Sequence, residues 1–186
     1  MQIERTALSE VLLIRPDVYR DSRGWLFESY HFSKMAELGI QNVFVQDNHL
    51  KSCQRGILRG IHFQNTPAAQ SKLVRCTVGR VADYAIDLRK GSPTYLRWIC
   101  VELTAEGFEQ LYIPAGFGHA VVSLTDESEV QYKVDLPYSP EHDRTVAWND
   151  PELAIEWPFP ENQLILSEKD ANAPLLHNSD CNFSYH

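Results

Sequence analysis

The sequence has little cysteine, few basic residues and no long apolar run. Its 186 residues include four cysteines, which lie far apart and form no CxxC pair. A chain of this length buries enough surface to fold without disulfides, so we expect no disulfide framework. The first residues, MQIERTALSE, also lack the apolar core of a signal peptide. Both features indicate a reduced, cytoplasmic protein.

Charge and hydropathy exclude two classes of partner. The chain carries 17 Lys and Arg against 25 Asp and Glu, for a net charge of −8, and shows no basic cluster. This removes the positive footprint that duplex nucleic acid requires. The longest apolar runs, such as residues 11–14, are far shorter than the roughly 20 apolar residues that cross a bilayer. We therefore expect neither a nucleic-acid partner nor a membrane span. A small anionic ligand remains compatible with this charge where a few basic residues converge.

The pattern along the chain predicts one all-β domain over residues 1–186. Glycine, proline, asparagine and aspartate recur at the spacing of turns between short strands. The segments between them are rich in β-branched and aromatic residues. The predicted strands are residues 72–78, 81–88, 95–103, 110–113, 119–124 and 129–134. Only residues 33–38 favour a helix, with Ser33 as cap and Gly39 as terminator. Six strands and one helix indicate a sandwich or barrel.

Alternation within the predicted strands assigns side chains to faces. In the last of them Val130, Tyr132 and Val134 share one face, so Tyr132 points inward with the apolar set. Cys76 and Cys100 also fall in predicted strands, and we expect them to be small core residues. The polar, irregular residues from 174 onward are expected to pack loosely or to lie on the surface.

The densest polar stretch comprises residues 46–49 and 55–64. Simple alternation puts Arg59 and His62 on different faces, unless Gly60 introduces a bulge. His62 is a candidate general base because its ordinary pKa lies near neutrality. The alternatives are a hydrogen-bonded core histidine at position 62 and an Arg59 that only pairs with a carboxylate.

Residues 114–119 have the P-x-G-x-x-H spacing of the second signature of cupin barrels, ending at His119. In metal-binding cupins that histidine is joined by an H-x-H pair, but here the position two after His62 is Gln64. Two separated histidines fall short of the three or four ligands that a metal needs. The sequence therefore predicts no metal and no cofactor.

Ordered motifs over nearly the whole chain resemble those of the dTDP-4-dehydrorhamnose 3,5-epimerases, metal-free sugar-nucleotide epimerases of the cupin superfamily. They include LRGIHFQ at 58–64, QSKLVR at 70–75, YK at 132–133 and LSEKD at 166–170. Further matches lie at residues 21–24, 28, 46–48, 87–89, 91–94, 113–119 and 148–151. The resemblance implies a cupin-type jelly-roll barrel with a few short flanking helices, and a homodimer.

The resemblance also implies four catalytic residues. His62 would be the proton acceptor, and Asp170 would orient it. Lys72 would face the substrate carbonyl, and Tyr132 would be the proton donor. A ketone at C4 acidifies the protons on C3 and C5, so a base, an oxyanion partner and a proton donor suffice without a redox cofactor.

The remaining matched residues are implied to bind a nucleotide-linked sugar. Those expected at the diphosphate are Arg23, Arg59 and Lys169, because guanidinium and ammonium groups suit phosphate oxygens. Those expected at the base or sugar are Glu28, Gln46, Asp47, Asn48, His119, Tyr138, which would stack on the base, and Asp143, where the family often has glutamate. Arg23 and Glu28 are implied to reach into the partner's site.

The sequence departs from the family pattern in two places near nucleotide and sugar: at Leu26, where an aromatic residue is common, and at residues 116–121, which read GFGHAV where the family has GFAHGF. The main hypothesis is conversion of dTDP-4-dehydro-6-deoxy-D-glucose to dTDP-4-dehydro-L-rhamnose. The alternatives are a mono-epimerase at C3 or C5, an epimerase of a GDP-linked keto sugar, and a cupin that binds a sugar nucleotide without turnover.

Overall fold

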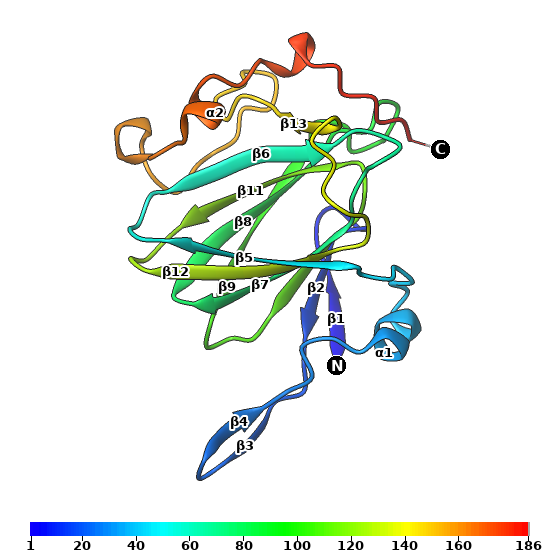
Figure 1. Ribbon diagram of the computed structural model, residues 1–186, viewed down its shortest axis with the longest axis vertical. Coiled ribbons are helices and arrows are strands. Elements are labelled where there is room, and N and C mark those ends of the chain that lie inside the picture. Colours follow the sequence, from blue (N-terminus) through cyan, green and yellow to red (C-terminus); the bar gives the residue numbers. More distant parts are fainter. Residues whose placement is uncertain (186) are drawn as a thin grey trace.

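Two antiparallel β-sheets face one another and enclose a barrel (Figure 1). The structure is a computed structural model that describes residues 1–185. The first sheet has the strand order β1 (Gln2–Arg5), β2 (Leu12–Arg15), β10 (Gln110–Ile113), β7 (Lys72–Val78), β12 (Ser128–Val134) and β5 (Gln46–Ser52). The second has the order β13 (Asp143–Thr145), β6 (Leu58–Gln64), β11 (Phe117–Ser123), β8 (Arg80–Asp87) and β9 (Trp98–Thr104). The expected all-β jelly-roll barrel is confirmed.

The helices are few and short, as expected. They are α1 (Phe32–Glu37), α2 (Glu168–Ala171) and the 3₁₀ turns η1 (Glu161–Gln163) and η2 (Leu176–Asn178). The helix begins at Phe32, one residue before the predicted start, and the predicted cap was wrong, because His31 rather than Ser33 caps it. Gly39 follows the helix with a φ of +91°, a conformation that glycine adopts at little cost. Within residues 1–185, no helix has the length and hydropathy needed to cross a membrane.

The predicted strands all exist. β7 and β10 have the predicted bounds, and the other four differ by one to three residues at an end. The largest difference is at β9, which begins at Trp98. The preceding residues form turns in which Tyr95 N–H donates to Ser92 and Arg97 N–H donates to Thr94, and Leu96 has a φ of +65°. Local turn geometry therefore shortens a segment whose composition favours a strand.

The core between the sheets follows from strand alternation. Val74 and Val130 from the first sheet meet Ala85 and Val121 from the second, and all four are buried. Burying a valine or leucine side chain contributes about 1.5–3 kcal/mol. Tyr132 lies against the same cluster, which confirms its predicted inward orientation.

A bulge in β6 resolves the open question about Arg59 and His62. His62 pairs with His119 and Arg59 pairs with Val121, so three steps along β6 match two along β11. At Gly60, φ is +133° and an added Cβ would lie 2.6 Å from the Ala120 side chain. Glycine is therefore required there, and the extra residue turns Arg59 and His62 to the same side of the sheet.

The C-terminal segment is more firmly held than predicted. Leu176, Cys181 and Phe183 are buried in a second apolar cluster on the outer face of the five-stranded sheet. The Phe183 and Phe63 rings pack with their centroids 5.4 Å apart. Few apolar residues suffice to anchor this tail, because the outer face of β6 offers an apolar surface that local sequence does not reveal.

All four cysteines are free, and two are buried. Cys76 belongs to the core as predicted. The same prediction for Cys100 was wrong, because Cys100 is exposed. It lies on β9, which is an edge strand of the five-stranded sheet.

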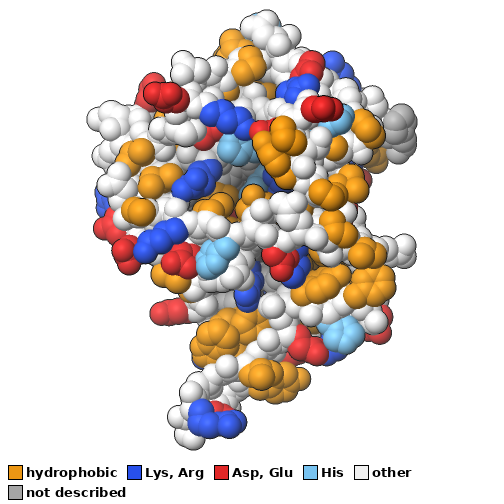
Figure 2. Space-filling view, viewed as in Figure 1, with side chains coloured by type: hydrophobic (Ala, Val, Ile, Leu, Met, Phe, Trp, Pro, Cys, Tyr) orange, Lys and Arg blue, Asp and Glu red, His pale blue; other side chains and the backbone are white. Residues whose placement is uncertain are grey.

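A two-stranded arm extends away from the barrel (Figure 1). It consists of β3 (Tyr19–Asp21) and β4 (Gly24–Leu26). Tyr19, Trp25 and Leu26 are each more than half exposed on it. Hydrophobic side chains gather near the base of the arm (Figure 2).

Candidate active site

A cavity of about 600 Å³ opens into the barrel between the two sheets. Its wall combines residues of β5, β6, β7, β11 and β12 with the segment that leads into α2. Lys, Arg and His side chains surround a hollow on this face of the molecule (Figure 2). Eleven of the fourteen predicted site residues line the cavity: Gln46, Asn48, Arg59, His62, Lys72, His119, Tyr132, Tyr138, Asp143, Lys169 and Asp170.

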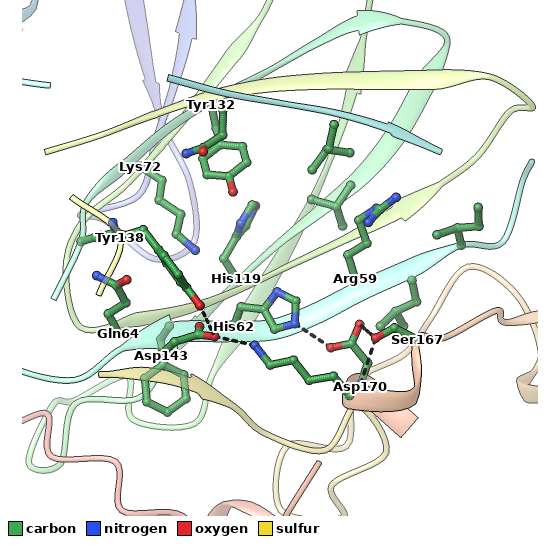
Figure 3. A pocket seen from close by; sticks show the side chains of 18 of the residues that line it. Arg59, His62, Gln64, Lys72, His119, Tyr132, Tyr138, Asp143, Ser167 and Asp170 are labelled. Carbon is green, nitrogen blue, oxygen red and sulfur yellow. Dashed lines mark hydrogen bonds and ion pairs between the residues drawn. The ribbon is translucent and has the colours of Figure 1, made fainter. Parts of the chain in front are cut away.

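His62 and Asp170 form a hydrogen-bonded pair at one wall (Figure 3). His62 Nε2 lies 2.6 Å from Asp170 Oδ1. Ser167 caps α2 by accepting from the Asp170 N–H, and its hydroxyl donates to Asp170 Oδ2 at 2.9 Å. Burial alone would raise the pKa of Asp170, but the hydrogen bonds from His62 and Ser167 bring it below its ordinary value. With Nε2 bound to Asp170, Nδ1 is the nitrogen that His62 presents to the cavity (Figure 3).

Lys72 is a buried cation at the cavity wall. Among residues 1–185, no side chain or backbone oxygen forms a hydrogen bond or ion pair with its Nζ, so the ammonium is available to a ligand. Burial lowers the pKa of Lys72 to about 8, partly offset by the charges of Asp83 and Asp143. Lys72 therefore remains mostly charged at neutral pH.

Tyr132 projects into the cavity from β12, in the sheet opposite to that of His62 (Figure 3). Burial raises the pKa of its phenol above the ordinary value. The hydroxyl therefore carries its proton throughout the neutral range, and a proton acceptor and a proton donor occupy opposite walls of one cavity.

Arg59 brings a second positive charge to the cavity. Its guanidinium donates to the Lys51 carbonyl at 2.9 Å and to Ser52 Oγ at 3.4 Å. These bonds orient the side chain along the end of β5. The planar guanidinium group, with its several N–H donors, is well suited to phosphate oxygens.

The segment between β12 and β13, residues 135–142, forms a strap that carries Tyr138 along the wall of the cavity. The Tyr138 N–H donates to Gln46 Oε1 at 2.9 Å, and the Ser139 N–H donates to Gln64 Oε1 at 2.8 Å. The Tyr138 hydroxyl lies 3.3 Å from Asp143 Oδ2. Lys169 Nζ donates to the same carboxylate oxygen at 2.6 Å. The exposed Tyr138 ring thus forms a flat surface at the mouth of the cavity.

Sequence reasoning missed the positioning roles of Gln64 and Ser167. Gln64 was noted only because it replaces a metal ligand, whereas here it anchors the strap through the Ser139 amide. Ser167 precedes Asp170 by three residues, and this S-x-x-D spacing is a helix-start signal that could have found it.

Three predicted site residues lie outside this cavity in the single chain. Asp47 faces the outer side of its sheet and binds Lys133 at 2.8 Å, because alternation turns it away from its neighbours in β5. Arg23 lies on the arm, where it pairs with Asp21 at 2.6 Å. Glu28 follows the arm and forms an ion pair with Lys34.

Within residues 1–185, no group of three His, Cys, Asp or Glu side chains is arranged to hold a metal ion. The cupin-signature histidine, His119, instead places its Nε2 2.9 Å from Asp83 Oδ1.

Residues 5–178 match the family model described as dTDP-4-dehydrorhamnose 3,5-epimerase. The chain belongs to the dTDP-4-dehydrorhamnose 3,5-epimerase family. The resemblance stated from the motifs is thereby confirmed, as is the class of enzyme, an isomerase.

The alignments of this epimerase with its relatives cover nearly the whole chain. A Salmonella typhimurium protein named dTDP-4-dehydrorhamnose 3,5-epimerase is 49% identical and aligns over 95% of this chain and 96% of its own. The crystal structure of an epimerase from Legionella pneumophila in complex with dTDP-4-keto-L-rhamnose has a TM-score of 0.94 and 41% identity, covering 100% of this chain and 98% of its own. A 3′-monoepimerase from Streptomyces bikiniensis in complex with dTDP-quinovose has a TM-score of 0.85 and 33% identity, covering 93% and 87%.

Proposed function

We propose that this epimerase converts dTDP-4-dehydro-6-deoxy-D-glucose to dTDP-4-dehydro-L-rhamnose by inverting C3 and C5. The observation that carries the proposal is the placement of the His62–Asp170 pair and the Tyr132 hydroxyl on opposite walls of one cavity. The Legionella relative, which binds dTDP-4-keto-L-rhamnose, supports the choice of nucleotide and sugar.

Proton removal begins at His62. Its Nε2–H donates to Asp170, which leaves the Nδ1 lone pair to accept a proton from C3 or C5. The C–H electron pair moves into the new C=C bond, and the C4 carbonyl electrons move to oxygen to give an enolate. Asp170 stabilises the imidazolium that forms, because its carboxylate remains ionised.

Lys72 is the partner for the developing oxyanion. Its side chain is buried, and its ammonium faces the cavity without a protein partner among residues 1–185. Electrostatic stabilisation by a preorganised charge is usually the largest single contribution to such a reaction.

Tyr132 completes the inversion. Its hydroxyl donates a proton to the carbon from the face opposite to His62, and the enolate electrons return to the carbonyl. Solvent then reprotonates the phenolate and takes the proton from His62. The same cycle at the second carbon completes the reaction, with no net oxidation or reduction.

The nucleotide half of the substrate is assigned to the polar rim. Arg59 and Lys169 supply positive charge for the diphosphate. Gln46 and Asn48, which share a hydrogen bond at 3.0 Å, supply donors and acceptors for base or sugar. The exposed Tyr138 ring offers a stacking surface for the base.

We also propose that the protein is a homodimer in which the arm of one protomer completes the site of the other. Arg23 and Glu28 match the family motif but lie outside the cavity of their own chain. The arm exposes Trp25 and Leu26, apolar side chains that a partner surface would bury. Asp47 lies on the outer face beside β12, where a partner residue would meet it.

A second candidate is inversion at one carbon only. The 3′-monoepimerase of Streptomyces bikiniensis shares the fold at 33% identity. The base and donor required for one inversion are the same as those required for two, so the residues present serve both reactions.

Proton NMR in deuterated water separates these functions. The dTDP-linked 4-keto-6-deoxyglucose is incubated with the protein, and the C3 and C5 signals are followed. We expect both to be lost, with formation of the rhamno product. Loss of one signal supports the mono-epimerase. Binding without loss of either signal supports a non-catalytic cupin, and no binding redirects the search to a GDP-linked sugar.

The cytoplasmic location expected from the sequence stays a prediction. The four cysteines of the protein are free thiols, which suits a reducing compartment. Fractionation of the source cells, with the protein followed by antibody, tests the location.

A further inference from the structure

A carboxylate, that of Asp83, lies buried behind the cavity wall. It belongs to β8 and does not line the cavity. The residues opposite it in the sheet are Val101 and Val121, and Val81 and Ala85 flank it on the same face of the strand. All four belong to the apolar core or pack against it. A charge in such surroundings is strongly unfavourable unless a partner compensates it.

Asp87, on the same face of the same strand, shows how a purely structural carboxylate is satisfied. It accepts hydrogen bonds from Arg89, Ser92 and Thr94 at both of its oxygens. In contrast, both oxygens of Asp83 share a single nitrogen, His119 Nε2, at 2.9 and 3.0 Å. Within residues 1–185, Asp83 has no other hydrogen-bond partner. Packing and local hydrogen bonding therefore do not explain a carboxylate at position 83.

The partner of Asp83 lines the active site. A carboxylate can only accept from Nε2, so it fixes His119 as the tautomer with a proton on that nitrogen. Nδ1 is then the nitrogen left for the cavity. Lys72 points into the same cavity from the facing sheet (Figure 3).

We propose that Asp83 is a positioning residue that holds His119 in one tautomer and keeps the Lys72 ammonium charged at the cavity wall. The assignment rests on the proposed function, in which Lys72 stabilises the oxyanion. It deepens that function because one buried carboxylate would control two groups that face the sugar.

The electrostatics of the site support this assignment. Among the charges that act on Lys72, that of Asp83 is the strongest and raises the pKa of the ammonium against the effect of burial. Burial lowers the pKa of His119, and Lys72 lowers it further, whereas Asp83 raises it. The other titratable and charged groups that face this trio are Arg59 and His62 from β6, Cys76 from β7, Cys100 from β9, Tyr132 from β12 and Asp143 from β13.

The Lys72 ammonium changes its charge just above neutral pH. Its pKa is about 8, whereas burial raises the pKa of the Cys76 thiol to about 11. Burial also raises the pKa of Tyr132 and of Cys100. An alkaline loss of activity with a midpoint near pH 8 therefore reports Lys72.

The first experiment titrates Lys72 without using turnover. Protein labelled with ¹³C at lysine Cε is titrated by NMR, with Lys72→Met to assign the signal. In Asp83→Asn, the Lys72 midpoint is expected to fall by about one pH unit, as is typical when an opposite charge is removed nearby. A histidine ¹⁵N spectrum tests the effect of Asp83 on His119: in Asp83→Asn, His119 is expected to lose its single Nε2–H tautomer. An unchanged Lys72 midpoint or an unchanged tautomer would overturn the assignment.

The second experiment measures the pH profile of C3 and C5 exchange. If the Lys72 midpoint falls from about 8 to about 7, the charged fraction at pH ~8.5 drops about eightfold, but by less than twofold at pH ~6.5. Asp83→Asn should show this pH-dependent loss, and Asp83→Glu should restore the alkaline midpoint. A merely structural defect would lower exchange equally at every pH.

Asp87→Asn is the matched control. It removes a buried charge from the same strand and is expected to lower stability without moving the alkaline midpoint. An equal shift in this control would contradict the proposal. The two experiments also separate failures: if the wild type shows no exchange but Asp83→Asn still lowers the Lys72 midpoint, the catalytic function fails and the electrostatic coupling stands.

Discussion

Asp170 Oδ1 lies 2.6 Å from His62 Nε2, although the two residues are 108 positions apart in the chain. The contact joins β6 to α2 and sets which imidazole nitrogen faces the cavity. Ser167 holds the carboxylate from its other side. The short segment around α2 therefore contributes to the reaction by orienting a base that lies on the barrel.

Asp170→Asn tests this relationship. The amide keeps the size of the side chain but can donate to His62 Nε2, which favours the tautomer with its proton on Nδ1 and blocks the base. We expect inversion to fall by about 100-fold to 10,000-fold, with little change in nucleotide affinity. Steady-state assays and dTDP binding measure both. Asp150→Asn, which alters a buried aspartate that accepts from the Leu176 N–H, is the control and should retain inversion. Near-normal turnover of Asp170→Asn would contradict the orienting role.

Tyr132→Phe separates proton removal from proton return. The phenyl ring fills the same space but cannot donate, so inversion should fall by about 100-fold or more. His62 remains able to remove a proton, and returning it to the same face leaves the sugar uninverted. Wash-in of deuterium should therefore exceed inversion in this variant. If exchange and inversion decline by the same factor, the assignment of His62 and Tyr132 to opposite faces is wrong.

Lys72→Met tests the cost of burying an ammonium at the site. Because the folded-state pKa is about 8 against 10.5 for the free side chain, the unfolded chain binds more protons between these values. The wild type therefore becomes relatively more stable as pH rises through this window and bears the full penalty below pH 8. At pH ~7, the variant should be more stable by up to about 3 kcal/mol, and the gain should vanish toward high pH. Urea unfolding at several pH values measures this.

The same variant should lose turnover, since methionine cannot stabilise an oxyanion. Lys90→Met, at an exposed position, provides the control and should change neither stability nor turnover appreciably. A loss of stability in Lys72→Met at neutral pH would contradict the inferred burial penalty.

Complementation tests the exchanged arm. Arg23→Ala should weaken substrate binding about 10-fold to 100-fold, as expected for a lost charge-assisted contact. His62→Asn should abolish turnover. Co-expression of the two variants as mixed dimers should restore about a quarter of the wild-type sites, because one site in each mixed dimer then has both residues.

Arg15→Ala, which breaks an exposed ion pair with Glu4 on the barrel, is the control for Arg23→Ala and should leave binding unchanged. Absence of recovery in dimers shown by light scattering would place Arg23 outside the partner's site. A monomer in solution at assay concentration would refute the arm exchange itself.

Much of this protein follows from local sequence. The six predicted strands exist because β-branched and aromatic runs alternate with turn residues, and a period of two then fixes which face each side chain takes. That rule alone oriented Tyr132 inward. It also turns Asp47 away from Gln46 and Asn48, a consequence that the motif comparison by itself passed over.

The tertiary structure decided what period and propensity do not encode. Whether Gly60 introduces a bulge depends on the close approach of Ala120 from the neighbouring strand, and that bulge brings Arg59 and His62 to one cavity. The burial of Phe183 depends on an apolar surface of β6 that is distant in sequence.

The pairing of Asp83 with His119 shows the same division most clearly. Each residue, read in its own strand, is an ordinary polar interruption of an apolar run. Only the packing of β8 beside β11 places the carboxylate and the imidazole within hydrogen-bonding distance inside the core. The sequence by itself determined six of the strands and the faces of their side chains, because these depend on neighbouring residues. The structure decided the pairs that carry the chemistry, because they depend on contacts between residues far apart in the chain.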